Sequence, residues 1–178
     1  MAVGHGAVHD GLSLRGRLTL IVLDADGNEV DRREGDNVIC VTGYTALAAS
    51  LVWSGIQDQA GNLGITTPTY LTPLYGAVGT GTGTVSHTDT QLFTEYERTT
   101  VGAGASTPAS STVSALCTWM FFFPNPPSTV VISEAGVFAN ATDAANSGDM
   151  VDHWAFSPTL TVPTTNSFVL QVSLLAGP

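Results

Sequence analysis

The chain contains no lysine, and its 178 residues include few charges of either sign. Without lysine there is no phosphate-loop lysine, no Schiff-base lysine and no serine–lysine dyad. Charged residues make up 11% of the chain, against a usual share of about 25%. The formal net charge is −10, and the phosphates of nucleic acids and anionic lipids repel such a chain. These absences exclude several enzyme classes and argue against nucleic acid and membranes as partners.

Cysteine and long apolar runs are also scarce. The two cysteines, Cys40 and Cys117, each lie in an apolar stretch, which is typical of a buried free thiol. Two cysteines do not make a disulfide framework, and the sequence leaves open whether they pair. No apolar run approaches the roughly 18–20 residues of a membrane helix, and the first residues do not resemble a signal peptide. We therefore expect a soluble protein made in a reducing cytoplasm.

Threonine, valine and glycine are abundant instead, and they favour strands and tight turns. Residues 17–23 alternate between apolar and other residues, an Asp-Gly pair follows, and residues 29–33 form a second strand-like run; together they predict a β-hairpin over residues 16–34. Apolar residues at helical spacing, after a capping threonine, predict one short helix near residues 43–53. Further strands are expected within residues 36–42, 70–78, 90–101, 111–123, 129–138, 150–156 and 168–175.

Seven or eight strands joined by Gly, Pro and Asn turns predict an all-β fold. We expect an antiparallel β-sandwich, jelly-roll or immunoglobulin-like, although a barrel stays open because the sequence does not give the strand order. Residues 1–13 are rich in glycine and histidine without periodicity, and they predict an N-terminal arm. Residues 14–178 are expected to form a single domain, which suits the length of the chain.

Several motifs invite a ligand. The Gly79–Gly83 repeat could cradle an anion with its backbone N–H groups, but no Lys-Ser/Thr follows it. Residues 24–29 resemble the front half of a calcium loop, but the twelfth position is Gly35 where an EF-hand has glutamate. His5 and His9 could ligate zinc, but a glycine-rich segment does not preorganise them. For the Gly79–Gly83 repeat we predict a flexible or partner-facing loop. For residues 24–29 we predict a hairpin turn, with weak calcium binding as a minor alternative. For His5 and His9 we predict a solvated or partner-contacting arm.

Two His–Asp combinations invite an acid–base interpretation. His87 lies close in sequence to Asp89, and Asp152 directly precedes His153. Adjacent residues of a regular strand point to opposite faces, so the second pair would not meet. No nucleophile elbow is present, and no cysteine has a histidine nearby in sequence. We predict no catalytic residue, no cofactor and no metal site.

Glutamate and tryptophan suggest carbohydrate chemistry. Glu95 and Glu97 would share one face of a strand, as in a glycosidase pair, but an ion pair with Arg98 is the simpler hypothesis. Trp53, Trp119 and Trp154 could form a sugar-stacking platform, although core packing is the default for aromatic residues in apolar runs.

The run Phe121-Phe122-Phe123-Pro124 indicates contact with another chain. Consecutive residues of a strand point to both faces of the sheet, so both faces need covering, one by the core and one by something else. A scarcity of charge agrees with a surface that lies against neighbours. These four residues, with His5 and His9 in the arm, are the interface candidates of a homo-oligomer.

Four segments of the second half have a recurring arrangement. They are a strand running into a Gly-Thr loop at Leu74–Thr82, then Asp89-Thr-Gln-Leu92, Glu95-Tyr-Glu-Arg98 and Ile132-Ser-Glu-Ala-Gly-Val-Phe138. Together they resemble a pattern common in bacteriophage virion proteins, over roughly residues 70–175. The segment 43–53 is also similar in character. The resemblance implies a small β-rich structural protein, assembled in copies on a phage head or tail, with no catalytic residues.

The resemblance makes Glu95, Arg98 and Glu134 structural residues. Arg98 is the only lysine or arginine of the second half, so we expect it in a buried pair with a carboxylate. We expect a head decoration or cement protein that clamps capsid subunits in the virion, often as a trimer. A tail, collar or baseplate component is the near alternative. A receptor-recognition module that binds carbohydrate through Trp53, Trp154 or Tyr70 is the rival from another class.

Overall fold

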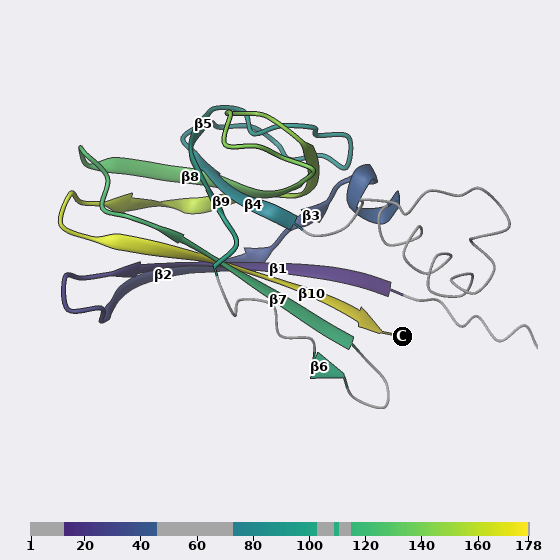
Figure 1. Ribbon diagram of the computed structural model, residues 1–178, viewed down its shortest axis with the longest axis horizontal. Helices are drawn as coiled ribbons and strands as arrows, with labels where there is room; N and C mark the ends of the chain where they lie inside the picture. The colour runs from purple at the N-terminus through teal and green to yellow at the C-terminus, as the bar shows by residue number, and fades with distance from the viewer. Residues whose placement is uncertain (1–12, 46–72, 103–108, 111–114, 178) are drawn as a thin grey trace, which may run out of the picture.

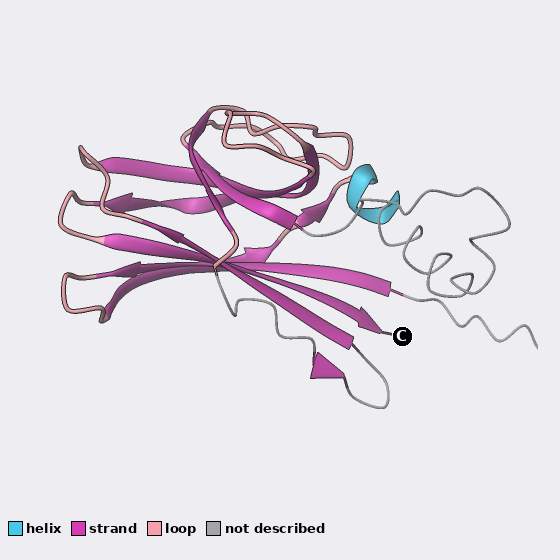
Figure 2. Cartoon of the chain, viewed as in Figure 1, coloured by secondary structure: helices cyan, strands magenta, loops and turns pink. Residues whose placement is uncertain are grey.

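The computed structural model describes residues 13–45, 73–102, 109–110 and 115–177 (Figure 1). Strands dominate this part of the chain, and a short helix occupies residues 41–45 (Figure 2). Most of the helix expected at 43–53 lies outside the described residues. So do the arm with His5 and His9, and both Trp53 and Tyr70.

Five strands form sheet A in the spatial order β2–β1–β10–β7–β6. They are β1 (Ser13–Leu23), β2 (Glu29–Asp36), β6 (Ala109–Ser110), β7 (Ala115–Phe123) and β10 (Ser167–Gly177). Five others form sheet B in the order β3–β9–β8–β4–β5. They are β3 (Val38–Ile39), β4 (Pro73–Gly79), β5 (Glu95–Thr100), β8 (Val130–Ala139) and β9 (Asp149–Val162). The pairings are antiparallel, and the expected all-β sandwich is confirmed.

The predicted hairpin is the β1–β2 pair. Its turn is held by the Asp24 side chain, whose Oδ1 accepts N–H groups of Asp26 (3.0 Å) and Asn28 (2.8 Å). Gly27 takes a positive φ of 82°, a conformation that glycine adopts without strain. The Asp24 carboxylate thus closes its own turn, as short polar side chains commonly do.

The main core lies between the two sheets. Sheet A contributes the alternate residues of β1, β10 and β7, among them Leu20, Phe121, Phe123 and Phe168. The rings of Phe123 and Phe168 stack with centroids 4.7 Å apart across the β7–β10 pair. Phe121 and Phe123 are fully buried within one chain, so their assignment as interface residues was wrong. Alternation along β7 sends these two rings inward, and Phe122 is the one ring of the three that lies on the outer face.

Sheet B is covered on both faces along most of β8. The β8 residues from Ile132 to Ala139 are all buried, which a sheet with one wet face does not allow. The loops after β4 and after β8 close over its outer face, at the top of Figure 1. Leu92 from the first loop packs there with Phe138 and Met150 in a second, smaller core. A chain that covers sheet B with its own loops needs polar groups to hold those loops in place.

Candidate functional site

Glu134 lies in the middle of β8, and its carboxylate is fully buried under the loop that joins β4 to β5. Its Oε1 accepts the backbone N–H groups of Gly81 (2.9 Å) and Thr94 (2.8 Å). Its Oε2 accepts the N–H of Phe93 (2.9 Å). One side chain of sheet B therefore binds the 80–94 loop at both ends.

The glycine repeat exists because this loop runs so close to the carboxylate. A Cβ atom on Gly79 or on Gly81 would lie 2.5 Å from Oε1 of Glu134, closer than real contacts allow. A Cβ on Gly83 would meet the Phe93 ring at 2.7 Å. Within the repeat only the N–H of Gly81 binds this carboxylate, and Phe93 and Thr94 at the far end of the loop supply the other two backbone N–H groups. The expectation of a flexible or partner-facing loop was wrong for Gly79 and Gly81, which are buried.

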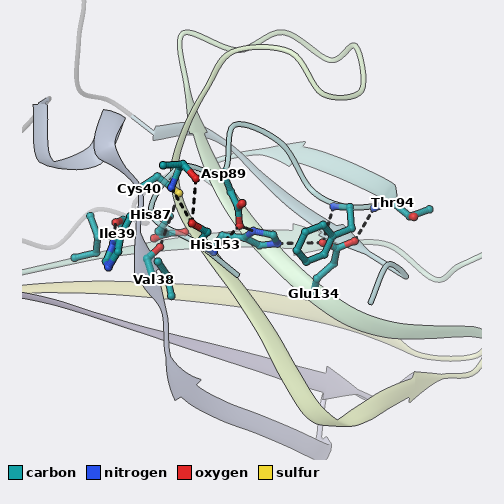
Figure 3. Close-up of polar contacts among 12 residues, drawn as sticks. Val38, Ile39, Cys40, His87, Asp89, Thr94, Glu134 and His153 are labelled. Atoms are coloured by element: carbon teal, nitrogen blue, oxygen red, sulfur yellow. Dashed lines mark hydrogen bonds and ion pairs between the residues drawn. The ribbon is translucent and has the colours of Figure 1, made fainter. Parts of the chain in front are cut away.

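His153, on the neighbouring strand β9, completes the arrangement (Figure 3). Its Nε2 lies 3.0 Å from Oε2 of Glu134, and its Nδ1 lies 2.7 Å from Oδ2 of Asp89 in the loop. Gly136 is the direct partner of His153 across the β8–β9 pair, so Glu134 and His153 are diagonal neighbours on one face. We call Glu134, His153, Asp89 and the three backbone N–H groups the Glu134 network.

The network holds a cation between two carboxylates. Burial by itself lowers the pKa of His153, but the hydrogen bonds to Glu134 and Asp89 outweigh it and raise that pKa above its ordinary value. Burial raises the pKa of Glu134, but the bonds from His153 and from the three N–H groups bring it below its ordinary value. Each ring nitrogen of His153 faces a carboxylate oxygen, which accepts hydrogen bonds, so the geometry suits the imidazolium form in which both nitrogens donate, and the pKa shift runs in the same direction.

This arrangement is closed to substrates. The His153 ring is fully buried and the Phe93 ring lies against it, with centroids 4.9 Å apart. Both ring nitrogens are occupied, so neither can accept a proton from a reacting group. Cys40 lies nearby, and burial raises the pKa of its thiol to about 12, which keeps it a protonated free thiol. Within the described residues no group of three His, Cys, Asp or Glu side chains is placed to hold a metal ion.

The predicted His–Asp combinations are arranged differently from their order in the sequence. Asp89 pairs with His153 rather than with His87, whose Nδ1 lies 2.8 Å from the carbonyl oxygen of Ile39. The side chain of Asp152 is not bonded to its neighbour His153, and its Oδ1 accepts the N–H of Val137 at 3.1 Å. The partnership of His153 with Glu134 was missed. The available signal was a glutamate and a histidine inside otherwise apolar strand segments, since buried charges are paired.

Asp152 is a buried carboxyl with an unsatisfied oxygen. Its Oδ2 has no hydrogen-bond partner among the described residues, and the same holds for the side-chain amide of Asn37. Burial raises the pKa of Asp152 to about 7, although the Val137 N–H and the nearby Asn37 amide lower it in part. Asn37 therefore lies close enough to act on Asp152 electrostatically but outside hydrogen-bond geometry. The Asp152 carboxyl of the folded state therefore keeps its proton up to about pH 7, whereas the same carboxyl in the unfolded chain releases it near pH 4.

The Arg98 guanidinium makes a second buried attachment. Its Nε and Nη2 bind the two oxygens of Glu95 at 2.6 and 2.7 Å, and the two side chains are 4% and 2% exposed. Its Nη1 donates to the carbonyl oxygens of Thr142 (3.0 Å) and Ser147 (3.1 Å), and to the Ser147 hydroxyl. Oε2 of Glu95 accepts the N–H of Asn146 at 2.9 Å. This pair fastens the loop after β8, as the Glu134 network fastens the loop after β4.

These contacts correct the expected role of Glu134 and confirm the ion pair that was preferred for Glu95 and Arg98. Glu134 is not a partner of Arg98, because its two oxygens are already used by His153 and by the loop N–H groups. Glu95 is not a free member of a glycosidase pair with Glu97, because Arg98 and a backbone N–H occupy both of its oxygens.

The outer face of sheet A is the contrasting region. Phe122 is 53% exposed there, Met120 43% and Leu175 37%, and Pro124 is exposed just beyond β7. Trp119 and Trp154 are buried in the main core, so they form no sugar-stacking platform.

Comparisons with protein-family models, with curated proteins and with solved structures found no match to the chain. None of the described residues belongs to a helix long and apolar enough to span a membrane.

Proposed function

We propose that this chain is a non-enzymatic structural protein of a bacteriophage virion, with head decoration as the first assignment. In that role it binds neighbouring capsid subunits and holds them together. Its partners are other virion proteins and further copies of itself, and it needs no cofactor.

The observation that supports this proposal is that the residues of the virion-like segments bind the chain's own loops. The segments that resemble virion proteins supply Gly81, Asp89, Leu92 and Glu134, which meet over the outer face of sheet B. Arg98, from the same set of segments, fastens the adjacent loop. In an enzyme, perturbed ionisable groups converge on an open cleft. The ionisable groups of this set bind the chain's own loops, which suits a protein whose work is to keep its shape.

The charge distribution supports an exterior position. A net charge of −10 repels packaged DNA, which carries a negative charge at every phosphate. A decoration protein on the outside of a head does not meet that DNA. The same argument fits a tail, collar or baseplate component, which is the alternative location.

The carbohydrate-binding rival loses one of its residues. Trp154 is buried against Phe156 in the core and cannot stack on a sugar. That rival now rests on Trp53 and Tyr70, which lie outside the described residues. Binding to a glycan array that is lost in a Trp53→Ala variant would favour it.

The proposal is tested on phage particles. Particles are purified on a density gradient from the source of this sequence, and the chain is measured by quantitative mass spectrometry and by immunogold labelling. We expect many copies per particle, with gold on the head. Gold on the tail would move the assignment to the alternative location. Purified particles that lack the chain would refute the proposal.

A further inference from the structure

The outer face of sheet A has an apolar half. Phe122 lies beside Val169 across the β7–β10 pair, and Met120 lies beside Gln171 in the next row. Ile21 extends the Val169 row onto β1, and Leu175 lies farther along β10, beyond the Ser173 hydroxyl, which lies 3.1 Å from the Thr118 hydroxyl. The exposed fractions of Phe122, Met120 and Leu175 are large for apolar side chains that share one sheet face.

The other half of the same face is charged but balanced. Arg17 pairs with Glu34, and Arg32 binds Glu34 at 2.7 Å and Glu29 at 2.7 Å. The strand register adds Arg15, which lies opposite Leu175 of β10, and Asp36, which lies opposite Arg17 of β1. The full set is Arg15, Arg17 and Arg32 against Glu29, Glu34 and Asp36. These charges cancel, so the whole net charge of −10 lies on other residues of the chain.

Within the described part of the chain, this is the open face of the sandwich. The inner faces of both sheets form the main core. The loops that the Glu134 network and Arg98 hold down cover the outer face of sheet B from Glu134 onward along β8, and leave Val131 near the start of that strand exposed. Figure 1 shows those loops on the sheet B side.

We propose that the outer face of sheet A binds the same face of a second copy of this chain, across a twofold axis. Two molecules that each carry a charge of −10 repel one another unless they meet through a neutral surface. The outer face of sheet A is such a surface, because its three arginines balance its three acids, and Arg17 and Arg32 are paired with Glu34 and Glu29 within it. In a twofold interface the same patch serves on both molecules, and an axis that runs across the strands in the plane of the interface packs the apolar halves against each other.

The size of the face fits this occupant. Four strands at the usual spacing make a surface about 20 Å wide, and nine residues of strand are about 30 Å long. The resulting area of about 600 Å² per molecule approaches the roughly 800 Å² per partner of a standard stable interface. Two sheets pack well in this way, with side chains interdigitated across about 10 Å. The inference goes beyond the proposed function and does not depend on it.

The test is the mass of the protein in solution, measured by light scattering and sedimentation velocity over a range of concentrations. We expect twice the 18.4 kDa of one chain. Phe122→Glu is expected to raise the dissociation constant at least a hundredfold and to leave single chains. Phe122→Ser is the second variant, in case a glutamate on β7 impairs folding, and circular dichroism verifies the fold of each. Val131→Glu is the matched control, because Val131 is a 48% exposed strand residue of sheet B.

A wild-type protein that stays a single chain, or forms an assembly larger than two chains, overturns the inference. A dimer that both Phe122 variants leave intact also overturns it, as does a dimer that Val131→Glu disrupts equally. A single chain that binds phage particles, and loses that binding with Phe122→Glu, assigns the face to another virion protein. That result overturns the dimer and leaves the proposed function standing. A dimer that is absent from purified particles refutes only the proposed function.

Discussion

Replacing Glu134 by glutamine tests whether the buried carboxylate holds the 80–94 loop. The two shapes are nearly identical, but glutamine has one acceptor oxygen and a donor NH₂ group in place of the second oxygen. In the wild type each oxygen accepts two hydrogen bonds, from Gly81 and Thr94 at one and from Phe93 and His153 at the other. In one orientation the N–H groups of Gly81 and Thr94 face the new NH₂ group, and in the other the N–H of Phe93 faces it while His153 can accept only by giving up its Nε2 proton.

The expected loss follows from those contacts. A hydrogen bond to a charged group contributes about 1.5–3 kcal/mol, and removing one member of a buried ion pair costs about 3–5 kcal/mol. We therefore expect Glu134→Gln to lower the free energy of unfolding by about 3–5 kcal/mol, out of the roughly 5–15 kcal/mol typical of a domain. For a chain of this length that corresponds to a fall in Tm of about 10 °C.

Denaturant unfolding followed by tryptophan fluorescence measures the free energy of unfolding. Hydrogen exchange measures how well the backbone amides of the 80–94 loop are protected. The amides of Gly81, Phe93 and Thr94 should exchange much faster in the variant. Glu97→Gln, the same change on β5 outside the network, should alter the free energy by less than about 1 kcal/mol. The pKa of Glu134 is lowered by folding, so its contribution is present above pH 4.5 and is lost as the pH falls further. The difference between wild type and variant should therefore shrink towards pH 3. Unchanged exchange at the three amides would refute the reasoning.

Three further predictions concern Arg98, the phenylalanines of β7 and Asp152. Arg98→Ala should cost about 3–5 kcal/mol and speed hydrogen exchange in the 140–148 loop, because it leaves a buried carboxylate unpaired; an unchanged Tm would contradict the pairing. Phe121→Ala should cost about 3–5 kcal/mol in denaturant unfolding and Phe122→Ala about 1 kcal/mol or less; equal losses would show that the inward and outward faces of β7 are misassigned. Asp152, whose pKa rises to about 7 on folding, should make the wild type less stable as the pH rises from 4 to 7. In melts at a series of pH values, Asp152→Asn should remove that slope and stabilise the protein at pH 8 by up to about 4 kcal/mol. If the wild type gains stability relative to Asp152→Asn as the pH rises across this range, the shift is contradicted.

The strands were predictable because their signals are local. Alternation and the Asp-Gly turn of the β1–β2 hairpin depend on residues close together in the chain, and the all-β class follows from them. The triple phenylalanine likewise predicted that both faces of its strand would carry a ring. Local pattern did not say which ring points inward, because a shift of one residue exchanges the two faces.

The network of the loop after β4 was not predictable in the same way. Asp89 and Glu134 each meet His153, from 64 and 19 residues away. The sequence shows only that an acid near His87 and a glutamate in an apolar strand need partners. The His–Asp pairs that are close in sequence, His87 with Asp89 and Asp152 with His153, are not the pairs that form. The strand order β9–β8–β4–β5 instead brings segments together that are far apart in the sequence.

The sequence by itself determined the class of fold, the scarcity of charge and the glycine repeat, since composition and short-range periodicity encode them. The tertiary structure alone decided what the repeat is for, which carboxylate Arg98 binds, and which sheet face stays open among the described residues. Those outcomes depend on strand order and register, which arise from the packing of the whole chain and which no local stretch of residues specifies.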